Sequence, residues 1–473
     1  MAGRSISAQR LLEYLTDVYL GLMLLVFLAY TGPGGYLTIT EDKFHLLLGL
    51  TGGYAAASLL LVLELWIVEE RRPASPHTFL KQVSPPQFFI LLYLLWTVLS
   101  TLCSVAPATS LWGTQRREGL VSIAMYCVAF LLVSFFGRPK KLHLWLFAAG
   151  VTFCCGVAVI QLLGYNPLLL FPEGMSYYKR SGYAGSFLGT VGNIDLLSAV
   201  LCVAIPVLWV AVLRLKGRWK YALLLPLALS LGVLCLSYVE AGLVGVFGGA
   251  LLTIPVVAPG DDRHRKRLAL GAGALILLTT AAIYFFGADM PGFLSEVHQL
   301  LHGHWDDDFG SGRLHIWRNV LPLIPERPLL GGGPDTLGIR GGVYFERYST
   351  QLNILLRSVA DAAHNEYLNV AINQGLPALL FYMTALLSAA VFWVKQSPQN
   401  TAAAICGAGV LGYCIQAFFG LSSIVSAPFF WLVLALLTSE MGRKNPHPVE
   451  IVAFPNSKMA DVGISSPGNV LSD

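Results

Sequence analysis

The residues best suited to chemistry lie in one polar segment, residues 288–374, which interrupts long apolar stretches. This segment contains six arginines and no lysine. A guanidinium group binds a phosphate through two parallel hydrogen bonds, which a lysine ammonium cannot reproduce. The strongest candidates for a site are Arg313, Trp317 and the cluster His364, Asn365 and Tyr367. An anionic, phosphate-bearing substrate is therefore the first hypothesis.

The rest of the chain is predominantly apolar. Hydrophobic residues make up 55% of the 473 residues and charged residues 12%, and the mean hydropathy is +0.64. Soluble proteins carry about a quarter charged residues, so this composition predicts a polytopic membrane protein. The net charge of +4 does not indicate nucleic-acid binding, because the basic residues are dispersed among loops. All eight cysteines lie in apolar stretches and are interpreted as packing residues, which argues against disulfides or a zinc site.

Twelve apolar stretches are long enough to cross a bilayer as helices, for which about 20 residues are needed. The predicted fold is therefore an all-α membrane protein with about twelve transmembrane helices and one large loop that contains short helices. The predicted spans are 11–31, 44–68, 87–105, 119–136, 142–164, 193–213, 221–238, 241–258, 268–287, 376–394, 401–420 and 427–441.

Charge in the connections predicts the orientation. Lysine and arginine are enriched in the even-numbered connections, which the positive-inside rule assigns to the cytoplasm together with both termini. Four parts follow: spans one to nine in residues 1–287, an extracytoplasmic catalytic loop in 288–375, spans ten to twelve in 376–441, and a disordered cytoplasmic tail in 442–473. Because no cleavage site follows the first apolar run, that run is interpreted as a retained helix.

Two short helices are predicted inside the loop. Residues 313–324 form an amphipathic pattern that is stopped by Pro325 and Pro328, with Arg313 and Trp317 four residues apart on one face. The glycine-rich residues 330–334 predict a turn.

The second short helix is predicted to begin with Asp361 as its cap and to run through Asn373. His364 would then lie in the first turn, where the helix dipole favours the neutral imidazole.

Several ordered pieces of the chain resemble one family, the O-antigen ligase and polysaccharide polymerase family of bacterial membrane glycosyltransferases. The pieces that carry the resemblance are Gly312-Arg313-x-x-x-Trp317, Pro328-x-x-Gly331-x-Gly333, Ala363-His364-Asn365-x-Tyr367-Leu368, Gly375-Leu376-Pro377, Arg180-x-Gly182, Gly189-x-x-Gly192-Asn193, and the segment Ser110 to Leu120. Together they cover residues 105–380, and the set in this order on a polytopic chain is more specific than any one piece.

The resemblance implies a GT-C-like fold and a reaction at the outer face of the cytoplasmic membrane. A glycan on a polyprenyl diphosphate would be transferred to a glycan, lipid or protein acceptor, without metal or cofactor. Guanidinium groups would stabilise the departing diphosphate: Arg313 first, supported by Arg180 and by Arg116 or Arg117. His364 would act as the general base. The other residues expected to contact substrate are Asn193, Trp317, Asn365 and Tyr367.

The chain departs from the family pattern at two acidic residues. Glu240 follows Ser237 where the family usually has Ser-Arg, and Asp195 stands for the second Asn of the Gly-Asn-x-Asn element. Either another arginine binds the diphosphate, or the chemistry of this subgroup differs, or Glu240 serves as the base. An interfacial carboxylate without a role is an equally open interpretation of Glu240.

Other interpretations remain at this stage. Arg313 could pair with a nearby carboxylate such as Asp308, Arg180 could contact lipid headgroups, and His364 alone could be a helix-start residue without function. The acidic and histidine-rich residues 302–308 have a composition suited to metal, although such loops are usually solvated. A polymerase that joins lipid-linked repeat units is the alternative within the enzyme class. A transporter is the alternative outside it, but the chain shows no repeat symmetry.

Overall fold

The computed structural model describes residues 8–67, 83–172, 185–290, 292–307, 309–340, 343–349 and 354–441. Arg180, Gly182 and Asp308, and the tail predicted to be disordered, lie outside these residues.

Most of the described chain is helical, and its helices overlap all twelve predicted spans. Eight helical segments of the described residues are long and apolar enough to cross a membrane, so the multi-pass membrane character is confirmed. The count of twelve crossings stays a prediction. The eight are α2 (Ile39–Ile67), α4 (Pro85–Leu102), α7 (Lys141–Leu162), α9 (Ile194–Arg214), η4 with α10 (Arg218–Leu223, Leu224–Ser237), α11, η5 and α12 (Glu240–Leu243, Val244–Gly248, Gly249–Val257), α13 with η6 (Asp262–Phe286, Gly287–Asp289), and α18 (Leu376–Gln396).

The remaining predicted spans correspond to shorter apolar helices. Three of these are α6 (Leu120–Phe136), α19 (Thr401–Ala417) and α20 (Ala427–Ser439). The first predicted span is α1 (Ala8–Gly21) followed by the π-helix η1 (Leu22–Phe27). After it comes the short 3-10 helix η2 (Gly35–Leu37).

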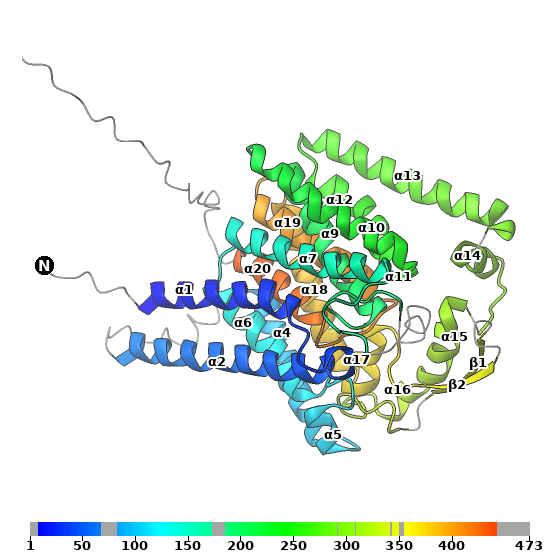
Figure 1. Cartoon of the computed structure of the whole chain (residues 1–473), viewed down its shortest axis with the longest axis horizontal. Coiled ribbons are helices and arrows are strands. Elements are labelled where there is room, and N and C mark those ends of the chain that lie inside the picture. The colour runs from blue at the N-terminus through cyan, green and yellow to red at the C-terminus, as the bar shows by residue number, and fades with distance from the viewer. Residues whose placement is uncertain are drawn as a thin grey trace, which may run out of the picture.

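Helix α20 forms the centre of the bundle. All of its residues are buried, which fits a helix that is apolar on every side. It packs against α6 and α19, and α19 packs against α9. Helix α13 is the opposite case, because none of its residues is buried. It lies at the outside of the bundle along α12 (Figure 1) and presents its apolar surface to the surroundings.

The polar elements gather at one end of the bundle, away from the first residues of α1 (Figure 1). A short helix from the connection between α4 and α6 lies at the same end. These elements are α5 (Pro107–Trp112), α14 (Phe293–Leu301), α15 (Phe309–Val320), α16 (Leu323–Glu326), strands β1 (Val343–Ser349) and β2 (Ile354–Ala360), and α17 (Glu366–Gln374).

The predicted helical class is confirmed for most of the described chain, and two short strands in the polar segment are an exception to it. They pair antiparallel, with Val343 opposite Ala360 and Ser349 opposite Ile354. Both strands are rich in β-branched, aromatic and aliphatic residues, which fit a pleated surface better than a helix. The hairpin was not predicted, because only short helices were expected in the polar segment.

Candidate active site

The glycine-rich turn at residues 330–334 docks onto the end of α4. The hydroxyl of Ser100 donates to the carbonyl of Leu330 at 2.6 Å, and the hydroxyl of Ser104 donates to the carbonyl of Gly332 at 2.9 Å. The amide of Val105 donates to the same Gly332 carbonyl at 3.0 Å. These bonds fix the polar segment to the transmembrane bundle.

Two glycines make this turn possible. Gly331 and Gly333 have φ angles of +62° and +106°, in the left-handed region that disfavours other residues. A Cβ on Gly331 would collide with the backbone of Asn373 in α17, and one on Gly333 would collide with the Ser104 hydroxyl. The turn therefore brings the end of α17 and the end of α4 together.

His364 lies two residues before the first residue of α17. The side chain of Asn365 caps this helix by accepting from the Leu368 amide at 3.0 Å, and the helix runs from Glu366. The prediction that Asp361 is the cap and that His364 lies in the first turn was therefore wrong. His364 instead has a φ of +48°, a conformation that few residues other than glycine adopt. The chain turns there, so the position of the imidazole is set by the turn.

Asp361 pairs with Arg116 across the interface between the two connections. The Arg116 Nε and Nη2 atoms donate to the two carboxylate oxygens of Asp361 at 2.9 and 2.7 Å. Burial acts to raise the pKa of Asp361, but the hydrogen bonds and charge of Arg116 outweigh it and lower that pKa. Asp361 is therefore an ionised partner of Arg116. The guanidinium predicted to support the substrate is held by a carboxylate in this structure.

Arg313 begins the helical part of α15 after a tight kink. Gly310, Ser311 and Gly312 all have positive φ, from 59° to 82°. The Arg313 Nε atom donates to the carbonyl of Phe419 at 2.9 Å, and Nη1 donates to the carbonyl of Gly310 at 2.6 Å. Among the described residues no carboxylate lies within 4.0 Å of its guanidinium. The charge of Arg313 is thus held by carbonyl groups and is not neutralised by an ion pair there.

The extent of this helix differs from the prediction. α15 ends at Val320, and a separate turn of helix, α16, follows from Leu323 to Glu326. The stop comes from Pro322, since the residue before a proline avoids the helical conformation. The predicted helix over residues 313–324 was therefore too long.

Trp317 connects Arg313 to His364. Its indole Nε1 donates to the carbonyl of Ala363, the residue before His364, at 3.0 Å. Its ring packs edge-on against Phe418, with ring centroids 5.6 Å apart. The predicted shared face of Arg313 and Trp317 is confirmed in that both side chains reach the connection at residues 418–419. Trp317 therefore links the helix that carries Arg313 to the turn that carries His364.

The environment of His364 strongly favours its neutral form. Burial, and then the positive charges of Arg116 and Arg313, lower the pKa of His364 to about 4, while Asp361 opposes the shift. The neutral imidazole was predicted, but its main cause is burial and not a position inside the helix. No side chain of the described residues hydrogen-bonds its ring nitrogens. The imidazole is thus a neutral group that can accept a proton.

The two acidic residues at which the chain departs from the family pattern interact electrostatically with Arg313. They are Asp195, an exposed residue in the first turn of α9, and Glu240, the half-buried first residue of α11. Glu240 also accepts a hydrogen bond from the backbone of Phe293. Arg313 is therefore electrostatically coupled to His364, Asp195 and Glu240, which belong to three separate parts of the chain.

Two other residues predicted to contact substrate, Asn193 and Tyr367, form hydrogen bonds within the chain. The Asn193 side chain caps α9 by accepting from the amides of Asp195 and Leu196 at 2.8 and 3.2 Å. The Tyr367 hydroxyl donates to the Cys414 carbonyl at 2.7 Å.

Arg117 has a φ of +56° and donates to both oxygens of Glu41 at 2.6 and 2.8 Å. Contacts of Arg117, Asn193 and Tyr367 with substrate stay predictions, as does any role of Arg180.

Two further carboxyl groups were not predicted, the half-buried Glu118 and the buried Glu366. Glu118 accepts from the Tyr126 hydroxyl at 2.8 Å, and burial raises the pKa of Glu118 to about 8. Glu366 accepts from the hydroxyls of Tyr382 and Tyr413 at 2.7 and 2.9 Å, and burial raises its pKa as well. Glu118 is an acidic residue next to two loop arginines, a pattern that could have suggested it.

Within the described residues, no group of three or more His, Cys, Asp or Glu side chains is arranged to hold a metal ion. His302, one of the residues with metal-like composition, stacks on Tyr284 with ring centroids 4.2 Å apart.

Within the described residues, a half-buried neutral base and a guanidinium without an ion-pair partner suit the transfer of a group away from an anionic leaving group. Residues 225–383 match the family model described as O-antigen ligase. This region belongs to the O-antigen ligase/polymerase family. The match includes Glu240, Arg313, Trp317 and His364. A comparison of the chain with curated proteins finds no match. The O-antigen ligase region and the apolar helices together identify a membrane enzyme of polysaccharide biosynthesis.

Proposed function

We propose that this chain is a glycosyltransferase of the O-antigen ligase type. It would transfer a glycan from a polyprenyl diphosphate to an acceptor hydroxyl at the outer face of the cytoplasmic membrane, without a metal. The observation that carries the proposal is the pair of Arg313 and His364 in the family-matched region, positioned together through Trp317.

The reaction needs a group that accepts the acceptor's proton. In the proposed step the acceptor oxygen attacks the anomeric carbon, and its proton passes to a ring nitrogen of His364. The bond from the anomeric carbon to the diphosphate oxygen breaks in the same step. The neutral imidazole, kept so by burial and nearby guanidinium groups, has the lone pair that this role requires.

The departing diphosphate needs positive charge. Arg313 supplies it in this proposal, because its Nε and Nη1 atoms are anchored to carbonyls and its Nη2 atom makes no hydrogen bond within the described chain. Donors that are held before the reaction stabilise developing charge without a cost of reorganisation.

Arg116 is proposed as a second contact that depends on Asp361. An incoming diphosphate would compete with Asp361 for the guanidinium that now makes two hydrogen bonds to it. Asp361 would then hold Arg116 in place while the site is empty.

Glu240 is the alternative base. Its carboxyl is coupled to Arg313 but also to Glu296 and to the backbone of Phe293. His364 is preferred because it lies in the matching motif and because Trp317 binds its own turn.

The acceptor distinguishes a ligase from a polymerase. The test is to give the purified chain one polyprenyl-diphosphate-linked glycan together with either a second copy of that donor or an unrelated glycan, lipid or protein acceptor. Longer lipid-linked glycan would indicate a polymerase, and product on the unrelated acceptor would indicate a ligase. Donor that crosses the bilayer with its diphosphate bond intact would indicate a transporter and contradict the proposal.

A further inference from the structure

A pocket opens into the bundle at the end opposite the candidate active site. It lies between η1, α7, α9, α19 and α20 and encloses about 70 Å³ of space. Its walls are apolar and include Leu24, Phe147, Val207, Ile405 and Val433. An apolar lining favours a segment of hydrocarbon over a polar ligand, because burial removes apolar surface from water.

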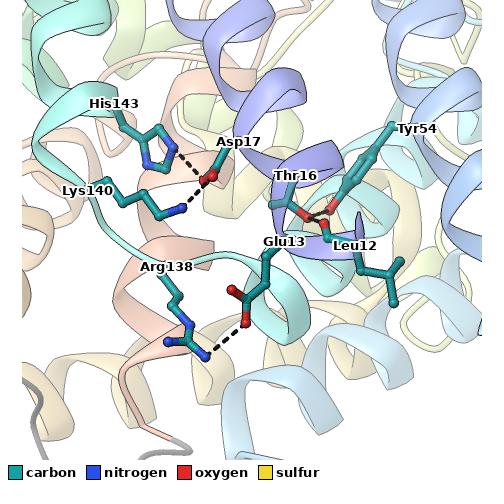
Figure 2. Close-up of polar contacts among 8 residues, drawn as sticks. All are labelled: Leu12, Glu13, Thr16, Asp17, Tyr54, Arg138, Lys140 and His143. Carbon is teal, nitrogen blue, oxygen red and sulfur yellow. Dashed lines mark hydrogen bonds and ion pairs between the residues drawn. The ribbon is translucent and has the colours of Figure 1, made fainter. Parts of the chain in front are cut away.

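Basic residues from the start of α7 line the mouth of this pocket. They are Lys140, Lys141 and His143. Lys140 and His143 both bind Asp17 of α1, the latter through Nε2 at 3.1 Å. Figure 2 shows the two side chains converging on Asp17. The single carboxylate of Asp17 therefore holds two of the three side chains.

The neighbouring basic residue Arg138 is also paired. It donates to the Glu13 carboxylate of α1 at 2.9 Å (Figure 2). Lys141, in contrast, has no ion-pair or hydrogen-bond partner among the described residues. Within the part of the chain that the structure describes, the Lys141 ammonium at the mouth of the pocket thus has no counter-ion.

Two further groups at this mouth have no hydrogen-bond partner among the side chains that the structure describes. His143 is only 3% exposed, and its Nδ1 atom is buried without a hydrogen bond. In Figure 2 this second ring nitrogen is turned away from Asp17. An unsatisfied buried polar atom costs about 1–3 kcal/mol. The first amides of α7 also lack a cap, because Lys140 at the N-cap position makes no side-chain hydrogen bond to them.

We propose that this pocket binds an anionic phospholipid. The phosphate would lie at the mouth against Lys141 and the first turn of α7, and part of one acyl chain would enter the apolar interior. Basic pockets between transmembrane helices are known to bind anionic headgroups, and a helix N-terminus favours a phosphate. Free phosphate would use only the mouth and leave the apolar walls without a partner.

The test uses the detergent-purified full chain with phosphatidylglycerol, phosphatidylcholine or inorganic phosphate. Native mass spectrometry measures how much of each lipid is retained, and the unfolding temperature measures stabilisation. The variants are Lys141→Gln at the mouth and Ala402→Phe in the wall. Lys395→Gln is the matched control, because Lys395 is an exposed basic residue at the same end that does not line the pocket.

We expect phosphatidylglycerol to be retained and to stabilise the protein, with phosphatidylcholine and inorganic phosphate having little effect. Lys141→Gln should weaken retention about fivefold, the equivalent of ~1 kcal/mol for one basic residue. Ala402→Phe should weaken it by filling the interior, and Lys395→Gln should leave it unchanged. Equal retention of the two lipids, equal stabilisation by inorganic phosphate, or unchanged retention in Lys141→Gln would each overturn the proposal.

Discussion

Replacement of Arg313 by lysine tests how the proposed site handles the diphosphate. The positive charge is kept, but the planar fork of donors is lost. In the structure the guanidinium donates from Nε to the Phe419 carbonyl and from Nη1 to the Gly310 carbonyl. Its Nη2 atom is then available to donate to a phosphate oxygen. A lysine ammonium is a single point and cannot bind both anchors and the substrate with the same geometry.

The size of the effect follows from that lost contact. A hydrogen bond to a charged group contributes about 1.5–3 kcal/mol, and ~1.4 kcal/mol corresponds to a tenfold change in rate. Arg313→Lys should therefore lower kcat/KM about 10- to 150-fold. The assay is the release of polyprenyl diphosphate from a lipid-linked glycan donor in proteoliposomes.

Arg318→Lys is the matched control for this variant. Arg318 lies on the same helix, is exposed and pairs with Asp307 at 2.9 Å, so its replacement should leave the rate unchanged. The unfolding temperatures of both variants should stay close to that of the wild type. A normal kcat/KM in Arg313→Lys would refute direct contact between Arg313 and the diphosphate.

Three further predictions concern the base and the orientation. His364→Ala should slow transfer about 10²–10⁴-fold at unchanged donor binding, whereas Glu240→Gln should change it little; the reverse pattern in product formation would assign the base to Glu240. Because the pKa of His364 is lowered from 6.5 to about 4, the imidazole stays neutral in the folded chain down to about pH 5, so transfer rates should not fall between pH 8 and 6. A rate profile with an apparent pKa near 6.5 would contradict this lowered pKa of His364. Because the unfolded chain binds this proton more readily, the contribution of His364 to the free energy of unfolding is complete above pH 6.5 and is lost as the pH falls toward 4. A tag inserted at Asp307 should be labelled from outside intact cells and one at Lys266 should not, and the opposite labelling would overturn the predicted orientation.

The helical architecture could be predicted because it depends on local composition. Each apolar stretch must satisfy its own backbone hydrogen bonds in a membrane, so length and hydropathy indicate a helix. The four-residue spacing of Arg313 and Trp317 also placed both side chains on one face, since that periodicity is intrinsic to a helix.

The errors occurred where neighbouring residues competed for one role. Asp361 and Asn365 are both suitable helix caps, but Asp361 is taken by Arg116, 245 residues away in the sequence. The helix is therefore capped by Asn365, and His364 lies outside it.

The contacts of Arg313 could not be predicted from residue types. Both of its anchors, at Phe419 and Gly310, are backbone carbonyls, and every residue of the chain has such an acceptor. Only the fold determines which carbonyl lies within reach. The raised pKa of Glu118 could not be predicted either, because it results from burial by the fold. The sequence around Glu118 does not show that burial.

The most direct test of the central claim is a double-variant measurement on Arg313 and His364. Release of polyprenyl diphosphate is measured in proteoliposomes for the wild type, Arg313→Ala, His364→Ala and the double variant, with an acceptor present. If the two residues act in one step, the wild type releases the lipid diphosphate, and the double variant is about as slow as the slower single variant, because groups that act as a unit are not additive. Release at the wild-type rate by His364→Ala, or losses that simply multiply in the double variant, would contradict a shared site.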